Sequence, residues 1–538
     1  MPVQSFIAAL KTMQQAPTEA NAEALFAMLR KEPDLADQAK PQLVSDPAFA
    51  AAYRVAQPGA DFQYHNTNMP MPRAIKRPTN LDTLVATVQG AADQFRALKA
   101  MGEGWGFANT SFTPDWLVHC ADLDSVLPLE DDLFGPNAPA KGDLVRFEAG
   151  ITFEKLNQYL DGQGRALMQQ PGFAGLTFLG CSAMGGHGSG LGYTGLSGYI
   201  EAIELVTLDS ANRARVLRIE PTKGLVDRAK WAARYPAPRF DLVQDDALFH
   251  TARCAQGNVG IVYAVTVRTQ PAYFLNETRV FMPWSQAWPQ VQGWLNHPAV
   301  HSLHVWINPY HPDPTVLVTK LTRTAQHQRA GARGIGILLG GMNPFTEAVR
   351  LFVATFPQAL PTLMDSALKS CQASDVSMPS YEALDFGAPN TIPVHAASLG
   401  FDAAKLDQVF PALMKELNDW TKVNQWVSSP IGLRWVKASE DYLSPQYGRD
   451  TVMLEMPIMK GTPNATDTLD RYANYMMDTW GARPHWGQLN PMTPTRFQNA
   501  YAGAWQKFVP GYRTLNPNGF FDGPFAKQIG LRELANAH

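Results

Sequence analysis

The segment Gly180–Gly192 constrains the fold of this chain more than any other part of the sequence. It reads GCSAMGGHGSGLG and holds six glycines in thirteen positions. Glycine has no Cβ, so such a segment can turn sharply and bring backbone N–H groups close to a flat or phosphorylated ligand. Ser182, His187 and Ser189 add polar side chains. The segment therefore predicts a loop that cradles a ligand inside a folded domain.

A second glycine-rich loop lies earlier in the chain, directly after a predicted strand over Phe95–Ala100. It reads GEGWGFAN from Gly102 to Asn109, so its amide groups can turn inward as a nest that suits an anion. Neither loop matches the GxGxxG motif, which opens a helix and has an acidic residue about 20 positions later, and GxxxxGK[ST] is absent. Two such loops in one domain favour a pyrophosphate cofactor. The alternative is a pair of ordinary turn-rich loops.

The charge balance argues against a nucleic-acid partner. The 538 residues include 45 Lys and Arg and 48 Asp and Glu, which leaves a formal charge of −3. Nucleic-acid binding needs a strongly basic surface. The composition therefore predicts a large, soluble, globular protein and does not indicate what it does.

Neither a structural metal nor a disulfide framework is expected. No CxxC pair occurs, and the histidines lack the local spacing of metal ligands, so no metal site is predicted. The cysteines are Cys120, Cys181, Cys254 and Cys371. We expect a reducing compartment, the cytoplasm.

The chain is also expected to lack a signal peptide and a membrane span. Lys11 stands where the apolar core of a signal peptide would be. The most apolar stretch, Gly334–Met364, is interrupted by Asn343, Pro344 and other polar residues before about 20 apolar residues accumulate.

Helix and strand patterns are interleaved along most of the chain, which predicts an α+β fold. Residues 1–61 form a helical N-terminal extension, residues 62–271 a first domain, residues 272–500 a second domain and residues 501–538 a C-terminal segment that returns to the first domain. The clearest predicted elements are a helix after Asn80 or Thr79, a strand over Trp116–Ala121, a helix over Phe153–Gly162 ended by an αL cap at Gly162, strands over Ile203–Leu208, Val259–Val267, His301–Asn308, Pro314–Lys320 and Val452–Pro457, and a helix over Asp402–Val423.

Several segments follow one another in a characteristic order. They are the GxGxGF loop, FEAGITFEKLNQYL, TFLGCSAMGGHGSG, LSGYIEAIELVTLDS and LFHTARCAQGNVGIVYAVTVRTQP, and later LRWVKASEDYLSPQYGRD, RPHWGQLN and YRTLNPNGFFDGPF. The first five resemble the FAD-binding domain of the vanillyl-alcohol oxidase superfamily, also called the p-cresol methylhydroxylase fold. The last three are similar to segments of its aldonolactone oxidases, alditol oxidases and flavin-linked cholesterol oxidases.

The resemblance implies a two-domain α+β flavoprotein. FAD would lie between a p-cresol methylhydroxylase-type FAD-binding domain and an antiparallel-sheet substrate domain covered by helices. Carried over residue by residue, the FAD contacts are Gly102, Gly104, Trp105, Gly106, Phe107 and Ala108, then Gly180, Gly185, Gly186, His187, Gly188 and Ser189, and then Gly257, Asn258, Gly260 and Val262.

This chain departs from the family at two positions. Many relatives carry histidine in the first loop and attach FAD covalently through it, but this chain has Trp105 there. We therefore expect noncovalent FAD. The Glu-x-Arg strand of the relatives reads Gly432-Leu433-Arg434 here, so one carboxylate of the active site is missing.

Four residues are candidates for catalysis. Arg434 would stabilise the negative charge of reduced flavin, and a surface arginine is the alternative. Gln488 stands in place of the lysine of an HWGK motif, so it keeps hydrogen bonding without the charge. His485 is then a candidate base or else a core histidine beside Trp486. Glu455, an acid on an apolar strand, could replace the lost carboxylate.

The strand that holds His304, Trp306, Asn308 and Tyr310 carries these residues on one face. That face could form the floor of a substrate site, and an ordinary sheet face is the alternative.

The resemblance implies an FAD-dependent oxidase or dehydrogenase. Hydride would pass from a C–H bond of a small organic substrate, an alcohol carbon, to the flavin, and oxygen or a quinone-type acceptor would reoxidise it. An oxidative enzyme acting on a bulky secondary metabolite, a flavin-binding protein without turnover, and a cofactor-free hydrolase or binding protein are the alternatives.

Overall fold

The computed structural model describes residues 2–43 apart from 17, 33–34, 36–37 and 40–41, residues 72–328 apart from 236 and 238, and residues 356–386 and 394–537. The helices are α1 (Pro2–Gln15), α2 (Glu19–Lys31), α5 (Leu81–Asp93), α6 (Phe153–Gly162), α7 (Phe178–Ser182), α8 (Arg228–Arg234), α9 (Asp246–Arg253), α10 (Trp284–Leu295), α12 (Leu360–Ser370), α13 (Ser380–Leu384), α14 (Leu406–Trp420), α15 (Ala465–Trp480), α16 (Pro494–Ala500), α17 (Trp505–Leu515), α18 (Pro524–Gln528) and α19 (Leu531–Ala537). The strands are β1 (Ala74–Lys76), β2 (Leu98–Met101), β3 (Trp116–His119), β4 (Val126–Leu127), β5 (Leu144–Glu148), β6 (Arg165–Ala166), β7 (Ile200–Leu208), β8 (Ala214–Glu220), β9 (Phe240–Gln244), β10 (Ile261–Arg268), β11 (Gln270–Pro271), β12 (Phe274–Pro283), β13 (Val300–Asn308), β14 (Thr315–Thr324), β15 (Ala373–Pro379), β16 (Val394–Asp402), β17 (Ile431–Val436), β18 (Thr451–Met459) and β19 (Arg483–Pro484).

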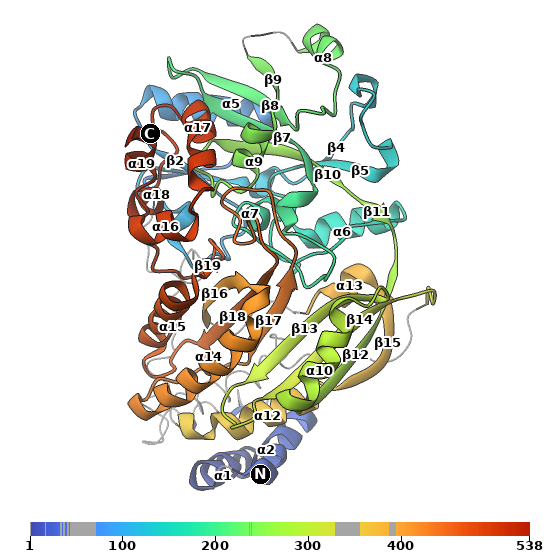
Figure 1. The fold of residues 1–538 in the computed structure, drawn as a ribbon, viewed down its shortest axis with the longest axis vertical. Helices are drawn as coiled ribbons and strands as arrows, with labels where there is room; N and C mark the ends of the chain where they lie inside the picture. Colours follow the sequence, from blue (N-terminus) through green and yellow to red (C-terminus); the bar gives the residue numbers. More distant parts are fainter. Residues whose placement is uncertain are drawn as a thin grey trace.

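The first half of the chain builds two sheets. A parallel sheet has the order β1-β3-β2, and a six-stranded sheet has the order β4-β5-β10-β7-β8-β9. Helix α5 packs between them, because its buried Leu84, Val88 and Ala91 join a core that also contains residues of β3, β7 and β10. Figure 1 shows this part at the upper end of the molecule.

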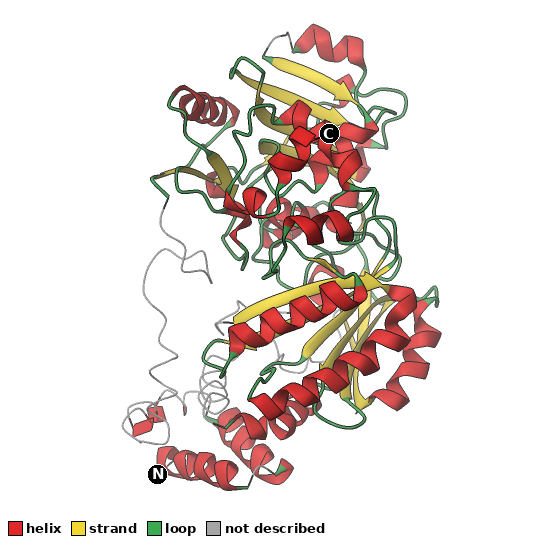
Figure 2. Ribbon diagram, turned by 60° about the vertical axis from the view of Figure 1, so that its left-hand side comes forward, coloured by secondary structure: helices red, strands yellow, loops and turns green. Residues whose placement is uncertain are grey.

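The second half builds one eight-stranded sheet with the order β15-β12-β14-β13-β17-β18-β16-β19, in which every pair is antiparallel. Helices α10, α14 and α15, labelled in Figure 1, cover one face of this sheet. Figure 2 shows helices lying along the strands of the lower part of the molecule. On β13, Leu303, Val305 and Ile307 point into the core under these helices, so the alternate residues His304 and Trp306 point to the other face. The fold is therefore α+β with an antiparallel-sheet domain covered by helices, as predicted.

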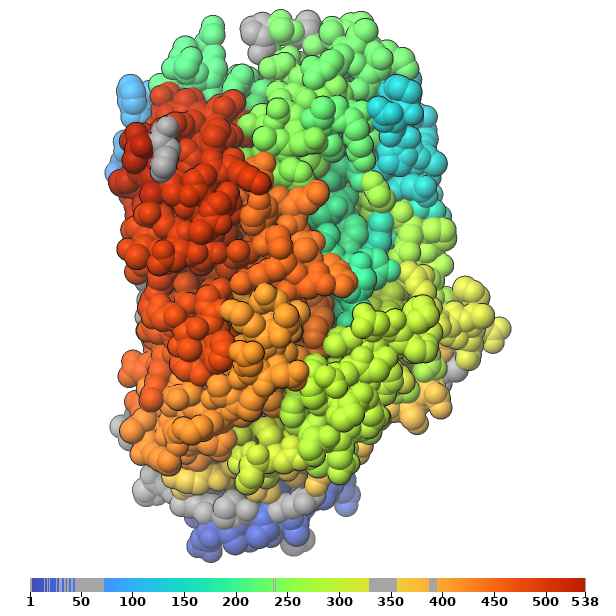
Figure 3. Space-filling view, viewed as in Figure 1, coloured from blue at the N-terminus to red at the C-terminus, as the bar shows by residue number. Residues whose placement is uncertain are grey.

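The C-terminal segment packs back on the first half. Helix α17 packs against α9, and Asn516 Nδ2 donates to the backbone oxygen of Asn258 at 2.9 Å. The amide of Leu98 donates to the oxygen of Phe520 at 3.4 Å. Figure 3 shows these C-terminal residues in red against the upper part of the molecule.

The N-terminal helices lie at the opposite end. Phe6 and Leu10 of α1 and Leu25 of α2 form a small core with Leu363 of α12 and with Ala359, which directly precedes α12. Residues 44–61 of the predicted extension and the boundary at residue 62 lie outside the described residues.

The cap predicted at the start of α5 is confirmed, and α6 also begins with a side-chain cap. Asn80 caps α5 through a reciprocal capping box with Thr83, and Thr152 caps α6. The predicted ends of one helix and one strand were wrong in detail. Gly162 is the last helical residue of α6, and the left-handed residue is Gly164 with φ +65°. Strand β3 ends at His119, where a 3-10 turn begins.

The strand predicted from Phe95 begins at Leu98. Phe95 has a left-handed φ of +53° and is 88% exposed, so the chain turns there after α5 before it enters the sheet. Its apolar side chain gave a misleading strand signal.

Candidate active site

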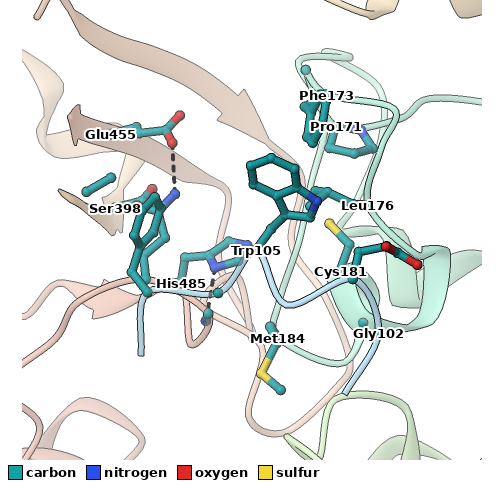
Figure 4. A pocket seen from close by; sticks show the side chains of 18 of the residues that line it. Gly102, Trp105, Pro171, Phe173, Leu176, Cys181, Met184, Ser398, Glu455 and His485 are labelled. Carbon is teal, nitrogen blue, oxygen red and sulfur yellow. Dashed lines mark hydrogen bonds between the residues drawn. The ribbon is translucent and has the colours of Figure 1, made fainter. Parts of the chain in front are cut away.

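A cavity of about 310 Å³ lies between the two halves of the chain. One wall comes from the loop after β2 and from the segment that contains α7; the other comes from β13, β16, β17, β18 and the segment after β19. Figure 4 shows Trp105 between Pro171, Phe173, Leu176 and Cys181 of the first wall and Glu455, Ser398 and His485 of the second.

The first glycine loop is folded around one threonine. Thr177 caps α7, and its Oγ1 accepts from the amide of Gly180 at 3.2 Å. A Cβ added at Gly102 would lie 2.2 Å from the same Oγ1, and one at Gly180 would lie 2.5 Å from it. Both glycines are therefore required by close packing at the edge of the cavity. Thr177 was not among the predicted site residues, although its place before a short helix is an N-cap signal.

The first loop is also joined to the second wall. The amides of Phe107 and Ala108 donate to the backbone oxygen of Gly487 at 2.7 and 3.3 Å. Gly487 lies in the segment RPHWGQLN, so this contact ties the loop to the segment that carries His485 and Gln488. These two amides already have an acceptor within the protein.

Seven of the predicted cofactor contacts line the cavity: Gly102, Gly104, Trp105, Gly106, Phe107, Gly180 and His187. The others lie outside its lining: Ala108, Gly185, Gly186, Gly188, Ser189, Gly257, Asn258, Gly260 and Val262.

The second glycine segment is compact because its glycines touch other parts of the protein. A Cβ at Gly185, whose φ is +77°, would lie 2.4 Å from the ring of Pro445, and one at Gly186 would lie 2.3 Å from Cys181 Sγ. Burial lowers the pKa of His187 to about 3, so its ring is neutral. Its Nδ1 lies 2.9 Å from the oxygen of Gly188, which makes Nδ1 the protonated nitrogen and leaves Nε2 an acceptor.

The third turn, which contains Gly257 and Asn258, is held by a buried lysine. Lys99 on β2 is 1% exposed, and its Nζ donates to Gly257 O at 3.0 Å, to Asn258 Oδ1 at 2.9 Å and to Phe521 O at 3.3 Å. Burial lowers the pKa of Lys99 to about 7. The lysine thus links β2, this turn and the C-terminal segment. Lys99 was not among the predicted site residues, and a lysine on a buried strand was the sequence signal that could have identified it.

Arg434 and Glu455 stand side by side on neighbouring strands. Glu455 on β18 lies directly opposite Gly432 on β17, and the carboxylate Oε2 is 3.6 Å from the guanidinium Nη2 of Arg434. Glu455 Oε1 also accepts from Gln488 Nε2 at 2.8 Å. The strand register therefore places the Glu455 carboxylate beside Gly432, the position at which the resemblance leads us to expect a glutamate.

His304 holds the other side of Arg434. The two residues are opposite each other on β13 and β17, and Arg434 Nε donates to His304 Nε2 at 3.5 Å. Burial and the charge of Arg434 lower the pKa of His304 well below its ordinary value, so the ring is neutral. The imidazole packs against Trp306 with ring centroids 4.2 Å apart and ring planes tilted by 34°. A Cβ at Gly432 would lie 3.2 Å from His304 Nε2, so glycine leaves room for this arrangement.

The predicted floor of β13 is only partly in the cavity. Trp306 lines it, whereas Asn308 Nδ2 donates to Asp365 at 2.7 Å and the Tyr310 hydroxyl donates to the oxygen of Val427 at 2.9 Å.

His485 has a defined tautomer. The amide of Gly487 donates to His485 Nδ1 at 3.2 Å, and burial lowers the pKa of His485 to about 4. The neutral ring therefore carries its proton on Nε2. In this form the free nitrogen is a donor, and this geometry favours Glu455 over His485 as a proton acceptor.

The residues around the cavity fit FAD. A Cβ at Gly106 would meet only Gly487 O, at 3.5 Å, so a flat ligand can approach the loop. Among the described residues, Ser189 Oγ and Gln256 Nε2 are buried without hydrogen-bond partners. They lie outside the lining of the cavity, in two segments to which the resemblance assigns nucleotide contacts. Arg434, whose side chain is 12% exposed, brings a positive charge to the lining of the cavity. These groups match a ligand that is flat and bears phosphates.

The described part of the chain holds no cluster of three or more His, Cys, Asp or Glu arranged for a metal ion. None of its helices is long and apolar enough to cross a membrane.

Comparison with family models matches the two halves separately. The family described as FAD binding domain matches residues 72–211, and the family described as D-arabinono-1,4-lactone oxidase matches residues 265–529.

Similar curated proteins span most of the chain. L-gulono-1,4-lactone dehydrogenase of Mycobacterium tuberculosis is 21% identical over 470 residues, which cover 85% of this chain and 96% of the relative. L-gulonolactone oxidase of Bos taurus is 20% identical, with 85% and 95% covered. Among solved structures, cholesterol oxidase from B. sterolicum superposes with a TM-score of 0.68 at 12% identity, covering 85% of this chain and 93% of that one.

Proposed function

The chain belongs to the FAD-dependent oxidoreductases of the p-cresol methylhydroxylase type, and we propose that Glu455 and Arg434 are the residues with which it oxidises an alcohol. It is an oxidase or dehydrogenase that acts on CH–OH groups. In our proposal Glu455 takes the proton of the substrate hydroxyl, and Arg434 balances the negative charge that arises on reduction.

The observation that carries this assignment is the placement of Glu455. Its carboxylate is 29% exposed and lines the cavity, where it lies between the amide of Gln488 and the guanidinium of Arg434. A carboxylate held in this way has a fixed direction and can accept a proton from a hydroxyl within hydrogen-bond reach. Gln488 Oε1 is buried without a partner among the described residues and is an additional acceptor beside it.

The reaction balances with these groups. The hydroxyl proton passes to Glu455, the carbon loses a hydride, and the product is a carbonyl compound. FAD, when bound, supplies the acceptor for the hydride. His485 Nε2–H is a donor that can orient the substrate oxygen, and neutral His187 adds no charge to the cavity. Arg434 stays in place because Glu455 and His304 hold it from two sides.

The test is anaerobic mixing of the purified flavoprotein with a panel of alcohols and lactones. We expect at least one member to bleach the visible flavin band, and Glu455→Gln to slow the bleaching by about 10²–10⁴-fold at unchanged FAD content. Glu440→Gln is the matched control, because Glu440 is 84% exposed. Unchanged bleaching in Glu455→Gln would remove Glu455 from this role. Absence of bleaching with every compound would favour a flavin-binding protein without turnover.

Three further parts of the proposal concern the cofactor linkage, the acceptor and the location. Trp105 offers no nucleophile in the first loop, so the FAD is held noncovalently. Oxygen or a quinone reoxidises it; peroxide formation distinguishes oxygen. The four cysteines are buried and none is joined in a disulfide, which supports a reducing compartment such as the cytoplasm.

A further inference from the structure

The sheet residues that line the cavity change from polar to apolar along the strands. On β16 the alternate residues Ser398, Ala396 and Val394 line the cavity. On β18, Glu455 is opposite Ser398 and Pro457 is opposite Ala396. One transverse row of the sheet is therefore polar, and the next row toward the start of β16 is apolar.

The polar groups gather at one end. Gln488 bonds to Glu455, Arg434 lies 3.6 Å from it, and the amide of His485 donates to the oxygen of Ser398 at 2.9 Å. Figure 4 shows Ser398, Glu455 and His485 together on one side of the cavity. This end has the groups that bind and deprotonate one hydroxyl.

The remaining sheet wall is apolar. Beyond the polar end, the described lining residues of the second half are Trp306, Val394, Ala396, Ser429, Pro430 and Pro457. Ser429 contributes the one hydroxyl among these side chains, and none of them is charged. Across the cavity, the rings of Trp105 and Phe173 meet edge to face with centroids 4.9 Å apart.

Two prolines make this wall rigid. The paired residues of β17 and β18 run from Val436 and Thr451 to Gly432 and Glu455, so the ladder stops before Pro430 and Pro457. A proline has no N–H to donate, and it is tolerated where a ladder has ended. The two rings present fixed apolar surface next to the polar row.

We propose that the substrate is an alcohol whose one hydroxyl-bearing carbon is attached to an apolar ring or chain, and not a polyhydroxylated sugar lactone. This inference rests on the proposed function. A sugar lactone would bring several hydroxyls against Ala396, Pro457, Pro430 and Val394, where a buried hydroxyl without a partner is costly. An apolar body loses no hydrogen bonds there and gains from leaving water.

The first arm of the test compares two sets of substrates by anaerobic reduction of the bound flavin. The apolar set is benzyl alcohol, cyclohexylmethanol and 1-indanol; the polar set is L-gulono-1,4-lactone, D-arabinono-1,4-lactone and xylitol. We expect the rate constant of reduction divided by the Kd to be about 100-fold higher for the best apolar alcohol than for the best polar compound. Equal or better reduction by the lactones overturns the inference and leaves the proposed function standing.

The second arm measures binding without turnover. The tertiary alcohol 2-phenylpropan-2-ol has no C–H bond on its hydroxyl carbon, so it can bind but cannot be oxidised. We expect it to shift the visible flavin spectrum at lower concentration than L-gulono-1,4-lactone does. If it binds in this way but no compound in the first arm bleaches the flavin, the proposed function fails and the apolar binding wall stands. If it does not bind, the inference is wrong.

Near-isosteric variants place the binding on this wall. Val394→Thr exchanges a methyl group for a hydroxyl at similar shape, and we expect it to raise the Kd of 2-phenylpropan-2-ol about 10-fold. Val423→Thr makes the same exchange at a residue that is 59% exposed and does not line the cavity, and we expect no change. The same Kd in Val394→Thr and wild type contradicts the inference.

Discussion

Gly432→Ala is predicted to displace the side chain that holds Arg434. A Cβ at residue 432 would lie 3.2 Å from His304 Nε2 and 3.4 Å from Trp306. Both distances are shorter than the optimal separation of about 3.5–4.0 Å between nonbonded atoms. The His304 ring must therefore move, and its hydrogen bond to Arg434 is already long at 3.5 Å. The substitution should break that bond.

The size of the effect follows from the bond that is lost. A hydrogen bond to a charged group contributes about 1.5–3 kcal/mol. For a two-electron couple about 1.4 kcal/mol corresponds to 30 mV, so the midpoint potential of the bound flavin should fall by at most about 30–65 mV. Residue 432 does not have a left-handed φ. An alanine there would otherwise stabilise the fold by about 0.4–1 kcal/mol. The predicted fall in midpoint potential therefore comes from the contact with His304 and not from backbone strain.

The assay is a reductive titration of the purified flavoprotein against a reference dye, which needs no substrate. Gly142→Ala is the matched control, because a Cβ there would have nothing within 4 Å. We expect the control to keep the wild-type potential. The reasoning is refuted if Gly432→Ala and Gly142→Ala have the same potential, since His304 would then have no part in positioning Arg434.

Three other predictions test the surroundings of the site. Acid precipitation should release the yellow colour into the supernatant, whereas colour in the pellet would show covalent FAD. Burial lowers the pKa of Lys99 to about 7, so above that pH the unfolded chain binds more protons than the folded one. The free energy of unfolding should therefore rise by up to about 5 kcal/mol as the pH increases from about 7 to 10. Lys99→Met should flatten this rise in urea unfolding, and an unchanged pH profile would contradict the assignment. Asp441→Asn should cost about 3–5 kcal/mol in the same measurement, because Asp441 is fully buried with Arg253 at 2.6 Å; a loss below about 1 kcal/mol would argue against a buried ion pair.

Local signals allowed much of the fold to be predicted. The cap at Asn80 and the alternation on β13 depend on residues a few positions apart, so the sequence alone contains them. The resemblance supplied the architecture and the cofactor. Phe95 misled because an exposed aromatic residue in a turn looks like the start of a strand.

The arrangement of the site depends on contacts between distant residues. Glu455 could be suspected from its apolar strand, but its place opposite Gly432 follows from the register of β17 and β18. His304 became a partner of Arg434 only because β13 pairs with β17. The tautomer of His485 is set by the amide of Gly487. Pairing between strands and loop contacts of this kind are not encoded in any local pattern.

The most direct test of the central claim is the deuterium isotope effect on anaerobic flavin reduction. The best substrate of the panel would be compared with the same compound deuterated at its hydroxyl-bearing carbon. If the C–H bond next to the hydroxyl gives its hydride to the flavin, deuteration should slow reduction severalfold. The comparison is made where mixing and binding of the substrate are faster than reduction of the flavin. An identical rate for the two compounds would then contradict oxidation of that carbon at this site.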